Sequence, residues 1–461
     1  MGTFSRGVTR RRFLGTAGAS MAATTGCLDS AEQSTPVAWP QRGYDAGATF
    51  YKTEGSPPVE DAEVVWTANV DNSLYAAIDE QWRGAWEQDR YRDLTNQRYI
   101  ATFANRYGRT PLIVVGDRAH VQGGKDSVVD LTDGTVVEQS NCAERALVGA
   151  ARTNTYRDGV IVGTGSSNGS DCRDRCVVLK GFRPPDGGAW CKGPQRWAAG
   201  APRDLASTAA AGRIADGMVV TVTPDREPPY RIVAIDADDG RIEWENTVPH
   251  GVHRLRVDDG VAYASVAGEA GGTMTILDGA STHQRVEIGP TDLLEAVRDD
   301  VSYFRDLGAK NKTPSIKAID TESGETRQLL DGPAVSERIA GTPAGVGDIV
   351  VGPDRLFATL QTETGSDPAI LALDRSDGAV EWVRQLSGPL RLTGTDDALY
   401  VAGSREPGPH AYALDPASGD RLWSVELPDR TGFGRGVYRP AVVDSKMLVP
   451  LSGLLVALEE P

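Results

Sequence analysis

The feature that most constrains the fold is a short unit that recurs through most of the chain. One copy runs from Ala411 to Leu427: small and apolar residues lead to Asp415, a short connection closes on Gly419, and a second alternating run carries Trp423. This order is typical of two antiparallel strands joined by a tight turn. Further copies have their Asp at Asp236, Asp320 and Asp374.

Each position of the unit has a physical reason. Gly supplies the positive backbone torsion of the turn, and the Asp carboxylate can bond turn amides. The small Ala before it leaves room for a neighbouring indole. With weaker forms such as those near Val129 and Leu458, the chain holds eight units. Their period of roughly 40 to 55 residues is typical of propellers and solenoids.

The unit A-[LI]-D-x(3)-G-x(3)-W resembles the repeat of the quinoprotein-like (PQQ-repeat) β-propellers. That family includes PQQ-dependent alcohol dehydrogenases and the BamB-like scaffolds of outer-membrane assembly. The resemblance covers about residues 60–461 and implies an all-β, eight-bladed propeller. Because a propeller hosts many activities, the resemblance leaves the function open.

The two ends of the repeat region complement each other. The run Val64–Val70, with Trp66, matches the second half of a unit that has no first half, whereas the last unit, Ala457 to Glu459, has no second half. We therefore expect the N-terminal strand to complete the C-terminal blade, so that no long sheet edge is exposed. Residues 61–461 then form one domain.

The first residues predict export. Residues 1–26 contain the twin arginines Arg10 and Arg11 before a weakly apolar run, as in a Tat signal peptide. Cys27 follows in a segment that resembles a lipobox, which predicts a lipoprotein on the extracytoplasmic face of the cell membrane. A second lipid chain is implied for stable attachment. The alternative is a soluble exported protein with an ordinary cleavage site. Residues 27–60 are interpreted as a linker.

The charge balance is strongly acidic. The net charge is -16, and removal of the signal's four arginines leaves -20, which argues against nucleic acid as a partner. Only 8 of the 48 basic residues are Lys, a balance that resembles haloarchaeal proteins. Solubility in high salt explains the acidity better than an acidic binding surface does.

The least repeat-like stretch is residues 71–109. Trp82 and Trp86 share a helical spacing with nearby apolar residues, which predicts a short amphipathic helix. Tyr91 and Tyr99 follow, each beside arginines. Aromatic residues and Arg anchor interfaces, so this insertion is a candidate partner-binding element at one face. The alternative is a helix that packs on the outside of the propeller with its two Trp buried.

Four cysteines are confined to the second unit and its approach: Cys142, Cys172, Cys176 and Cys191. In an exported protein they predict two disulfides, with three pairings open. Zinc is the alternative, but Cys-x(3)-Cys is not a usual finger spacing and no His lies nearby.

The family resemblance implies a cofactor for its enzymatic members only. A PQQ dehydrogenase needs calcium, a catalytic Asp and, in alcohol-oxidising members, a disulfide between adjacent cysteines. No Cys-Cys pair occurs, and no ligand position can be matched residue by residue. Residues Asp236–Gly240 superficially resemble a calcium loop, but an Asp-Gly turn explains them better. No nucleophile motif is present.

The sequence thus predicts a monomeric propeller whose blades are docked by Trp66, Trp244, Trp382 and Trp423. We expect a protein-binding or assembly scaffold with protein partners at one face, a lipid anchor in the membrane and no cofactor. The alternative is a PQQ-dependent dehydrogenase of alcohols or sugars with PQQ and calcium. A polysaccharide-binding or redox-partner module is a third possibility.

Overall fold

The computed structural model divides the chain into Met1–Ser34 and Thr35–Pro461. All described residues belong to the second unit. They are residues 37–39, 41, 44–45, 48–53, 55, 57–70, 112–121, 126–140, 147–151, 160–167, 176–182, 195–198, 213–215, 217–222, 230–248, 252–268, 271–289, 291–306, 315–331, 335, 337–362, 367–388, 390–405, 408–429, 437–451 and 453–461.

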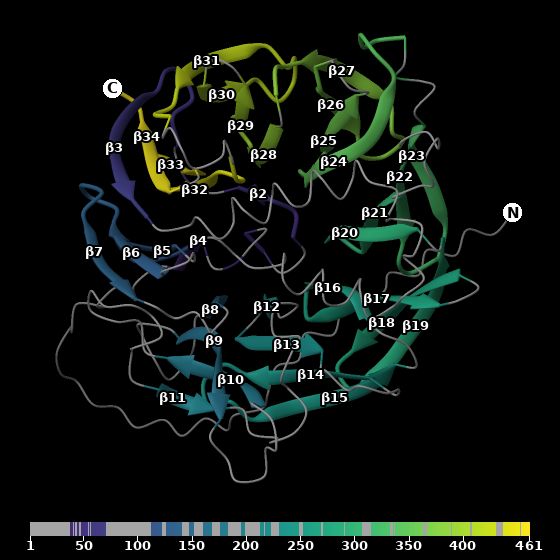
Figure 1. Ribbon diagram of the computed structural model, residues 1–461. Coiled ribbons are helices and arrows are strands. Elements are labelled where there is room, and N and C mark those ends of the chain that lie inside the picture. Colours follow the sequence, from purple (N-terminus) through teal and green to yellow (C-terminus); the bar gives the residue numbers. More distant parts are fainter. Residues whose placement is uncertain are drawn as a thin grey trace, which may run out of the picture. The chain divides into compact units, whose positions relative to one another are not determined.

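The described strands form eight sheets, each with four antiparallel strands, which follow one another along the chain in all sheets but the last (Figure 1). Sheet 1 contains β4 (Leu112–Val115), β5 (Arg118–Val121), β6 (Asp126–Asp130) and β7 (Val136–Ser140), with β1 (Val37–Trp39) beside β4. Sheet 2 contains β8 (Leu147–Ala151), β9 (Val160–Ser167), β10 (Cys176–Phe182) and β11 (Gln195–Ala198). Sheet 3 contains β12 (Arg213–Ala215), β13 (Met218–Val222), β14 (Tyr230–Asp236) and β15 (Ile242–Val248). Sheet 4 contains β16 (Val252–Asp258), β17 (Val261–Gly268), β18 (Gly271–Asp278) and β19 (Ser281–Ile288).

The remaining sheets follow the same plan. Sheet 5 contains β20 (Asp292–Arg298), β21 (Val301–Asp306), β22 (Ser315–Asp320) and β23 (Thr326–Asp331). Sheet 6 contains β24 (Pro343–Val351), β25 (Arg355–Thr362), β26 (Ala369–Asp374) and β27 (Val380–Gln385). Sheet 7 contains β28 (Leu390–Thr395), β29 (Leu399–Arg405), β30 (Gly408–Leu414) and β31 (Arg421–Glu426), with β2 (Tyr51–Lys52) parallel to β28. Sheet 8 contains β32 (Ala441–Val443), β33 (Lys446–Leu451) and β34 (Leu454–Glu459), completed by β3 (Glu63–Asn69).

The repeated Asp and Gly form the turn between the third and fourth strands of five sheets. In each, the Gly N–H donates to the carbonyl oxygen of the Asp at 2.8–2.9 Å, with the Gly φ between 71° and 79°. The Asp carboxylate accepts a hydrogen bond from the amide two residues later, as from Thr132 to Asp130 (2.8 Å) and from Asp238 to Asp236 (2.6 Å). The turn at Asp236 is therefore structural, as the sequence indicates.

The small Ala of the unit lies directly across from the Trp of the same sheet. Four such pairs occur in the strand registers: Ala234 with Trp244, Ala372 with Trp382, Ala413 with Trp423, and Ala457 with Trp66. The last pair joins β34 to β3, so the N-terminal strand completes the C-terminal sheet. Glu63 of β3 thus pairs with Glu459 of β34, although most of the chain separates them.

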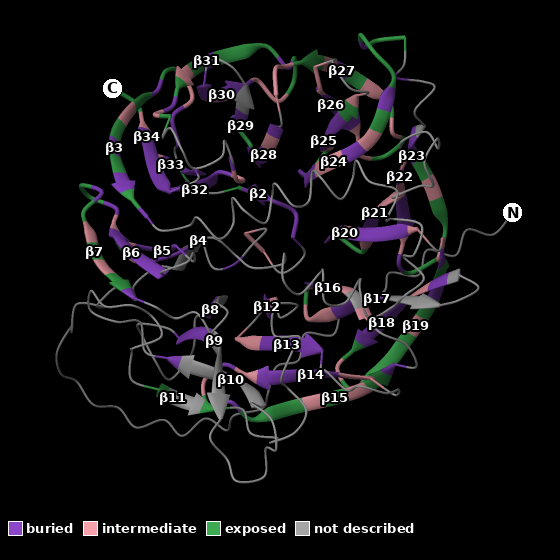
Figure 2. Ribbon diagram, viewed as in Figure 1, coloured by how far each residue is buried: buried purple, intermediate pink, exposed green. Residues whose placement is uncertain are grey.

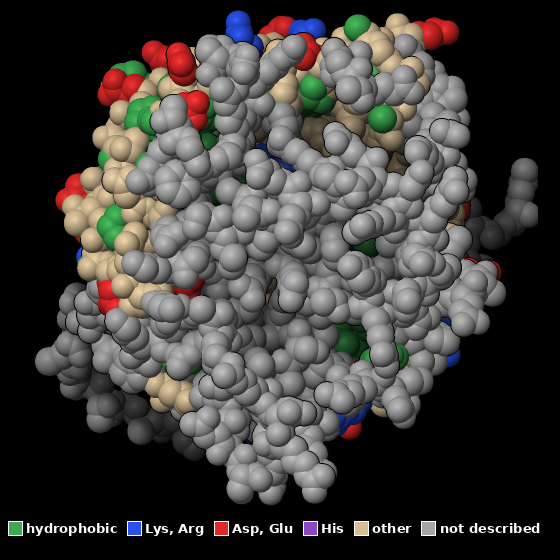
Figure 3. All heavy atoms as spheres, viewed as in Figure 1, with side chains coloured by type: hydrophobic (Ala, Val, Ile, Leu, Met, Phe, Trp, Pro, Cys, Tyr) green, Lys and Arg blue, Asp and Glu red, His purple; other side chains and the backbone are tan. Residues whose placement is uncertain are grey.

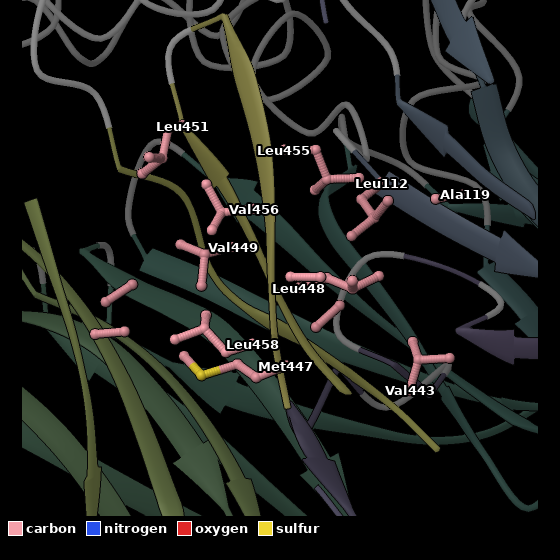
Figure 4. Packing of buried hydrophobic residues seen from close by; sticks show 14 of the residues in the cluster. Leu112, Ala119, Val443, Met447, Leu448, Val449, Leu451, Leu455, Val456 and Leu458 are labelled. Atoms are coloured by element: carbon pink, nitrogen blue, oxygen red, sulfur yellow. The ribbon is translucent and has the colours of Figure 1, made fainter. Parts of the chain in front are cut away.

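The hydrophobic core lies between neighbouring sheets. One cluster combines sheets 7, 8 and 1, and Figure 4 shows Leu448 and Leu455 of sheet 8 on the side toward Leu112 of β4. The first strands of successive sheets, from β4 to β28, contact one another in chain order. Middle strands are mostly buried, whereas fourth strands such as β15, β19 and β31 alternate between exposed and partly buried residues (Figure 2).

The described residues confirm the predicted all-β class. None of the helices among them is long and apolar enough to cross a membrane. The predicted helix in residues 71–109 lies outside the described residues.

Each sheet has two ends that differ in their connections. At the turn end, the first strand joins the second and the third joins the fourth. At the loop end, the second strand joins the third and the chain passes to the next sheet. Outside sheet 2, turn-end connections have two to six residues. The loop ends of β3 and β4 are joined by a longer connection, residues 70–111.

Candidate functional site

Residues 41–52, called here the N-terminal segment, bind the first strands of several sheets. The buried side-chain amide of Gln41 pairs with both backbone groups of Ile214 on β12: Nε2 donates to the carbonyl oxygen (2.6 Å), and Oε1 accepts from the N–H (3.1 Å). Asp45 then closes a turn by accepting the Thr49 N–H at 2.9 Å. Part of the stretch interpreted as a linker is therefore packed into the body.

The backbone of the N-terminal segment continues these contacts into sheets 6 and 7. The carbonyl oxygen of Thr49 accepts from the N–H of Val351, the last residue of β24 (2.9 Å). The carbonyl oxygen of Phe50 accepts from the N–H of Gly394 near the end of β28 (3.0 Å). Both partners stand just before a turn, so the segment lies at the turn ends of these strands.

Side chains of the N-terminal segment bind three sheets. The Tyr51 hydroxyl donates to Asp396 Oδ1 (2.9 Å) in a sheet 7 turn. The Lys52 Nζ donates to the carbonyl oxygen of Val442 in sheet 8 (3.2 Å). The guanidinium of Arg298, at the end of β20 in sheet 5, lies 5.4 Å from the centre of the Tyr51 ring. One short segment thus holds turn ends of sheets 3, 5, 6, 7 and 8.

Beyond the N-terminal segment, the inner strands carry a group of basic side chains with two carboxylates. This group, called here the arginine cluster, comprises Arg213 (β12), Arg254 and Arg256 (β16), Arg305 (β21), Arg391 (β28), Arg439 (before β32), Glu295 (β20) and Asp348 (β24).

Glu295 stands among several arginines. Its Oε1 accepts from Arg305 Nε at 2.6 Å, and its backbone oxygen accepts from Arg256 Nε at 2.7 Å. Burial alone would raise its pKa. Four arginines outweigh burial and hold the pKa of Glu295 below its ordinary value: Arg305, Arg254, Arg256 and Arg439.

Asp348 likewise lies among arginines of the cluster. Its Oδ2 accepts from Arg439 Nε (2.8 Å) and from the backbone N–H of Leu392 (3.3 Å), and its Oδ1 lies 3.8 Å from the Arg391 guanidinium. Burial would raise its pKa, but Arg439 and Arg391 lower it below the ordinary value. Both carboxylates are therefore ionised near neutral pH.

Two further arginines of the cluster have lowered pKa values. Arg213 Nε donates to the backbone oxygen of Leu255 (3.2 Å), and burial together with nearby Arg254 lowers the pKa of Arg213 to about 10. Burial also lowers the pKa of Arg254, in spite of the opposing charge of Glu295.

Three arginines of the cluster lie near the loop ends of their strands. Arg213 is the first residue of β12, Arg391 is the second of β28, and Arg254 is the third of β16. Each of these strands begins at the loop end. The N-terminal segment, which lies at the turn ends, contacts the cluster directly. The Arg439 guanidinium stacks 3.4 Å from the centre of the Phe50 ring.

The two carboxylates of the arginine cluster do not suit proton transfer near neutral pH. A general acid or base needs a pKa near the working pH, whereas Glu295 and Asp348 both have lowered pKa values. Among the described residues, no three His, Cys, Asp or Glu side chains converge as a metal site requires.

Acidic side chains also lie on the outer part of the molecule. Asp and Glu side chains are visible at the surface over β3, β7 and β31 (Figure 3). Glu63 on β3 and Glu426 on β31 are exposed. The arginine cluster thus belongs to a chain whose net charge is -16.

The predicted docking tryptophans lie between sheets. The indole N–H of Trp66 donates to Leu131 of sheet 1 (3.1 Å), and that of Trp382 donates to Pro416 of sheet 7 (3.0 Å). The indole N–H of Trp423 donates to Pro58, in the segment before β3 (3.0 Å). Trp244 is half-buried against the core shared by sheets 3 and 4.

Most other predicted site residues lie outside the part of the chain that is described. Cys176 begins β10 opposite Ser167, and only its backbone is described. The predictions for the remaining residues stay predictions: Arg10, Arg11, Cys27, Trp82, Trp86, Tyr91, Tyr99, Cys142, Cys172 and Cys191.

Sequence reasoning missed the arginine cluster and the N-terminal segment. One sequence signal could have predicted the cluster: an arginine recurs near the start of the first strand of a unit, as at Arg254 and Arg391. No local pattern marks Gln41, because its partner Ile214 is distant in sequence.

Comparison with known proteins agrees with the repeat. The family described as outer membrane protein assembly factor BamB matches residues 189–327 and again residues 312–460, together more than half of the chain. Among curated proteins, none matches the sequence.

Solved structures share the fold at low sequence identity. The quinohemoprotein alcohol dehydrogenase from Comamonas testosteroni has 11% identity and a TM-score of 0.54, with 93% of this chain and 81% of that chain covered. A quinohemoprotein alcohol dehydrogenase from Pseudomonas putida HK5 has 11% identity and a TM-score of 0.53, with 94% and 82% covered. BamB from Moraxella catarrhalis has 13% identity and a TM-score of 0.47, with 76% and 96% covered. The family match and the two dehydrogenase structures support a PQQ-repeat β-propeller fold.

Proposed function

Because the chain belongs to the family of the outer membrane protein assembly factor BamB, we propose that it is a protein-binding scaffold. In this proposal the eight sheets are the blades of an eight-bladed propeller, which is exported and anchored in the cell membrane by lipid on Cys27. Protein partners dock at the loop end. The family description names an assembly factor, a role that depends on contacts with other proteins.

The observation that carries this proposal is the difference between the two ends. The N-terminal segment occupies the turn ends through bonds such as those of Gln41 and Tyr51. The loop ends of β3 and β4 are instead joined by the longest connection between strands, residues 70–111, whose sequence contains Trp82 and Trp86. Aromatic side chains and Arg are the residue types that anchor protein interfaces. This proposal therefore puts the partners at the loop ends, away from the N-terminal segment.

Blade closure supports the eight-bladed arrangement. First strands of neighbouring sheets contact one another from β4 to β28, and one core cluster combines sheets 7, 8 and 1. Because β3 pairs with β34, the last sheet has its full set of four strands. Such closure leaves only short, protected edges.

Catalysis by a quinone is the competing account, since two quinohemoprotein dehydrogenases share the fold. Equilibrium titration of the full chain with PQQ and calcium, followed by tryptophan fluorescence and a dye-linked alcohol oxidation assay, separates the two. The scaffold predicts neither saturable quinone binding nor turnover. Tight binding with alcohol oxidation would overturn the proposal.

The anchor is tested separately. A Cys27→Ser variant should appear in the medium or the soluble extracytoplasmic fraction while the wild type fractionates with membranes. Equal membrane retention of both would contradict attachment by lipid on Cys27.

A further inference from the structure

We infer that residues 37–52 form a releasable strap, which holds the membrane tether close to the eight sheets and detaches while the sheets stay folded. The strap, as defined here, consists of β1 and the N-terminal segment together with the residue between them. Its effect on the tether rests on the lipid anchor of the proposed function, whereas its detachment requires no anchor.

The strap enters and leaves the body at the turn ends. β1 is antiparallel to β4, so Val37 pairs with Val115 at the turn end of that strand. β2 is parallel to β28 and ends beside Thr395, again at the turn end. Both ladders are short, because β1 has three residues and β2 has two. Few ladder pairs therefore need to break for the strap to leave.

The bound backbone of the strap is strained. Tyr44, Ala48 and Phe50 have φ values of 70°, 59° and 55°, in a region that residues with a Cβ rarely adopt. Among the described residues, every other non-glycine residue with positive φ is an Asp, which tolerates this conformation better. Such strain persists only while surrounding contacts hold it, and it clusters in clamps and switch regions. Detachment of the strap would relieve it at all three positions.

A buried carboxyl of the strap interacts with a carboxyl of sheet 4. Asp45 accepts hydrogen bonds from the Thr49 N–H (2.9 Å) and the Thr49 hydroxyl, both within the strap. Burial raises the pKa of Asp45 in spite of these bonds and of the Arg298 charge. At the end of β16, burial and then the charge of Asp45 raise the pKa of Asp258 to about 6. The two carboxyls therefore repel each other once both are ionised.

Ionisation of these carboxyls should weaken the strap. The other charged groups that act on the pair are two arginines and two aspartates: Arg213, Arg298, Asp299 and Asp300. Because the folded pKa of Asp258 exceeds its ordinary value, its contribution to strap binding is complete below about pH 4 and is lost as pH rises through 6. The strap should thus be held at acid pH and open more often near neutral pH.

Detachment would change how far the sheets can stand from the membrane. With the strap bound, residues 28–36 join Cys27 to the body, which limits the reach to about 35 Å. Pro58 is held in the body by the Trp423 indole, so release of the strap adds residues only up to 52. The limit then rises to about 90 Å for residues 28–52. The strap would therefore set the distance at which the scaffold can meet its partners.

The test is hydrogen exchange of the full chain, read by mass spectrometry from pH 4 to pH 8 and corrected for the intrinsic exchange rate at each pH. Strap peptides are compared with peptides of the buried strand β33 in the same samples. We expect strap opening to rise about tenfold from pH 4 to pH 7 and then level off, while β33 stays protected. Strap peptides as protected as β33 at every pH, or opening that does not change with pH, would overturn the inference.

Two variants and a matched control assign the pH dependence. Asp258→Asn should abolish the rise, because an amide does not ionise. Asp45→Asn should do the same, since the amide oxygen still accepts the Thr49 N–H. Glu322→Gln removes a carboxylate from an exposed turn of sheet 5 and should open as the wild type does. Thermal unfolding checks that each variant folds. An unchanged rise in either folded Asp variant, or its loss in Glu322→Gln, would contradict the inference.

Failure of this inference is distinguishable from failure of the proposed function, because hydrogen exchange needs neither a lipid anchor nor a partner. If the strap opens as expected but Cys27→Ser stays with membranes, the strap stands and its role in a lipid tether fails. If Cys27→Ser leaves the membrane but the strap never opens, the anchor stands and this inference fails.

Discussion

At the scale of single residues, contacts between Trp and Gly explain why the repeat needs both. A Cβ atom on Gly419 would stand 2.6 Å from the Trp382 ring of the preceding sheet, and one on Gly134 would stand 2.7 Å from the Trp66 ring. Both glycines also have positive φ. The Gly therefore closes its own turn and accepts the indole of a neighbouring sheet.

The first prediction separates these two demands. Gly419→Ala should destabilise the protein by about 2–4 kcal/mol, because strained torsion adds to the clash with Trp382. Gly260→Ala is the control: its φ is +77°, but nothing lies within 4 Å of the added Cβ. It should cost only about 1 kcal/mol. Denaturant unfolding measures both, and equal losses would show that the indole contact is unimportant.

The second prediction concerns pH. Burial is the main cause that raises the pKa of Asp258 to about 6, and the nearby carboxylate of Asp45 is the second. The negative charges of Asp299 and Asp300 add to the rise, whereas a hydrogen bond from the Asp299 backbone opposes it. Because the folded pKa exceeds the unfolded one, this group's stabilising contribution is complete below about pH 4 and is lost as pH rises through 6.

Asp258→Asn should therefore be more stable than the wild type above pH 6 by about 1 kcal/mol, a figure reduced because the carboxyl keeps some solvent contact. The gain should shrink as pH falls toward 4. Unfolding free energies of both proteins across this range provide the measurement, and a pH-independent difference would rule out this role for Asp258.

At the scale of elements, the sequence predicts the closing strand β3 but not the N-terminal segment. Trp66 sits in half of a repeat unit, so the pairing of β3 with the last sheet follows from the pattern. The N-terminal segment has no such unit. Its contacts are polar bonds from Gln41 and Thr49 to backbone groups of distant strands, which hydrophobic periodicity does not report.

The third prediction tests the closing strand. Deletion of residues 63–69 would leave β34 without its partner and expose its edge, so we expect loss of cooperative unfolding and of solubility. Deletion of residues 28–36, which precede all described residues, is the control and should leave unfolding cooperative. Similar effects of the two deletions would contradict closure by β3.

At the scale of the whole molecule, the arginine cluster is an assembly of many sheets. Arg213, Arg305 and Arg391 come from three different sheets, and only the arrangement of the inner strands brings their charges to one place. The sequence predicts the repeat, the class and the family because these depend on local patterns. It does not predict the arginine cluster, because no single unit contains it.

The most direct measurement of the central claim is photo-cross-linking in intact cells from the two ends of the sheets. A photoreactive residue is placed at Trp86 on the loop-end connection or, as the matched control, at Glu322 in an exposed turn of sheet 5. The account predicts a discrete protein adduct from position 86, which disappears when the surrounding aromatic residues are replaced, and none from position 322. Equal adducts from both positions, or none from position 86, would contradict a scaffold that binds at its loop end.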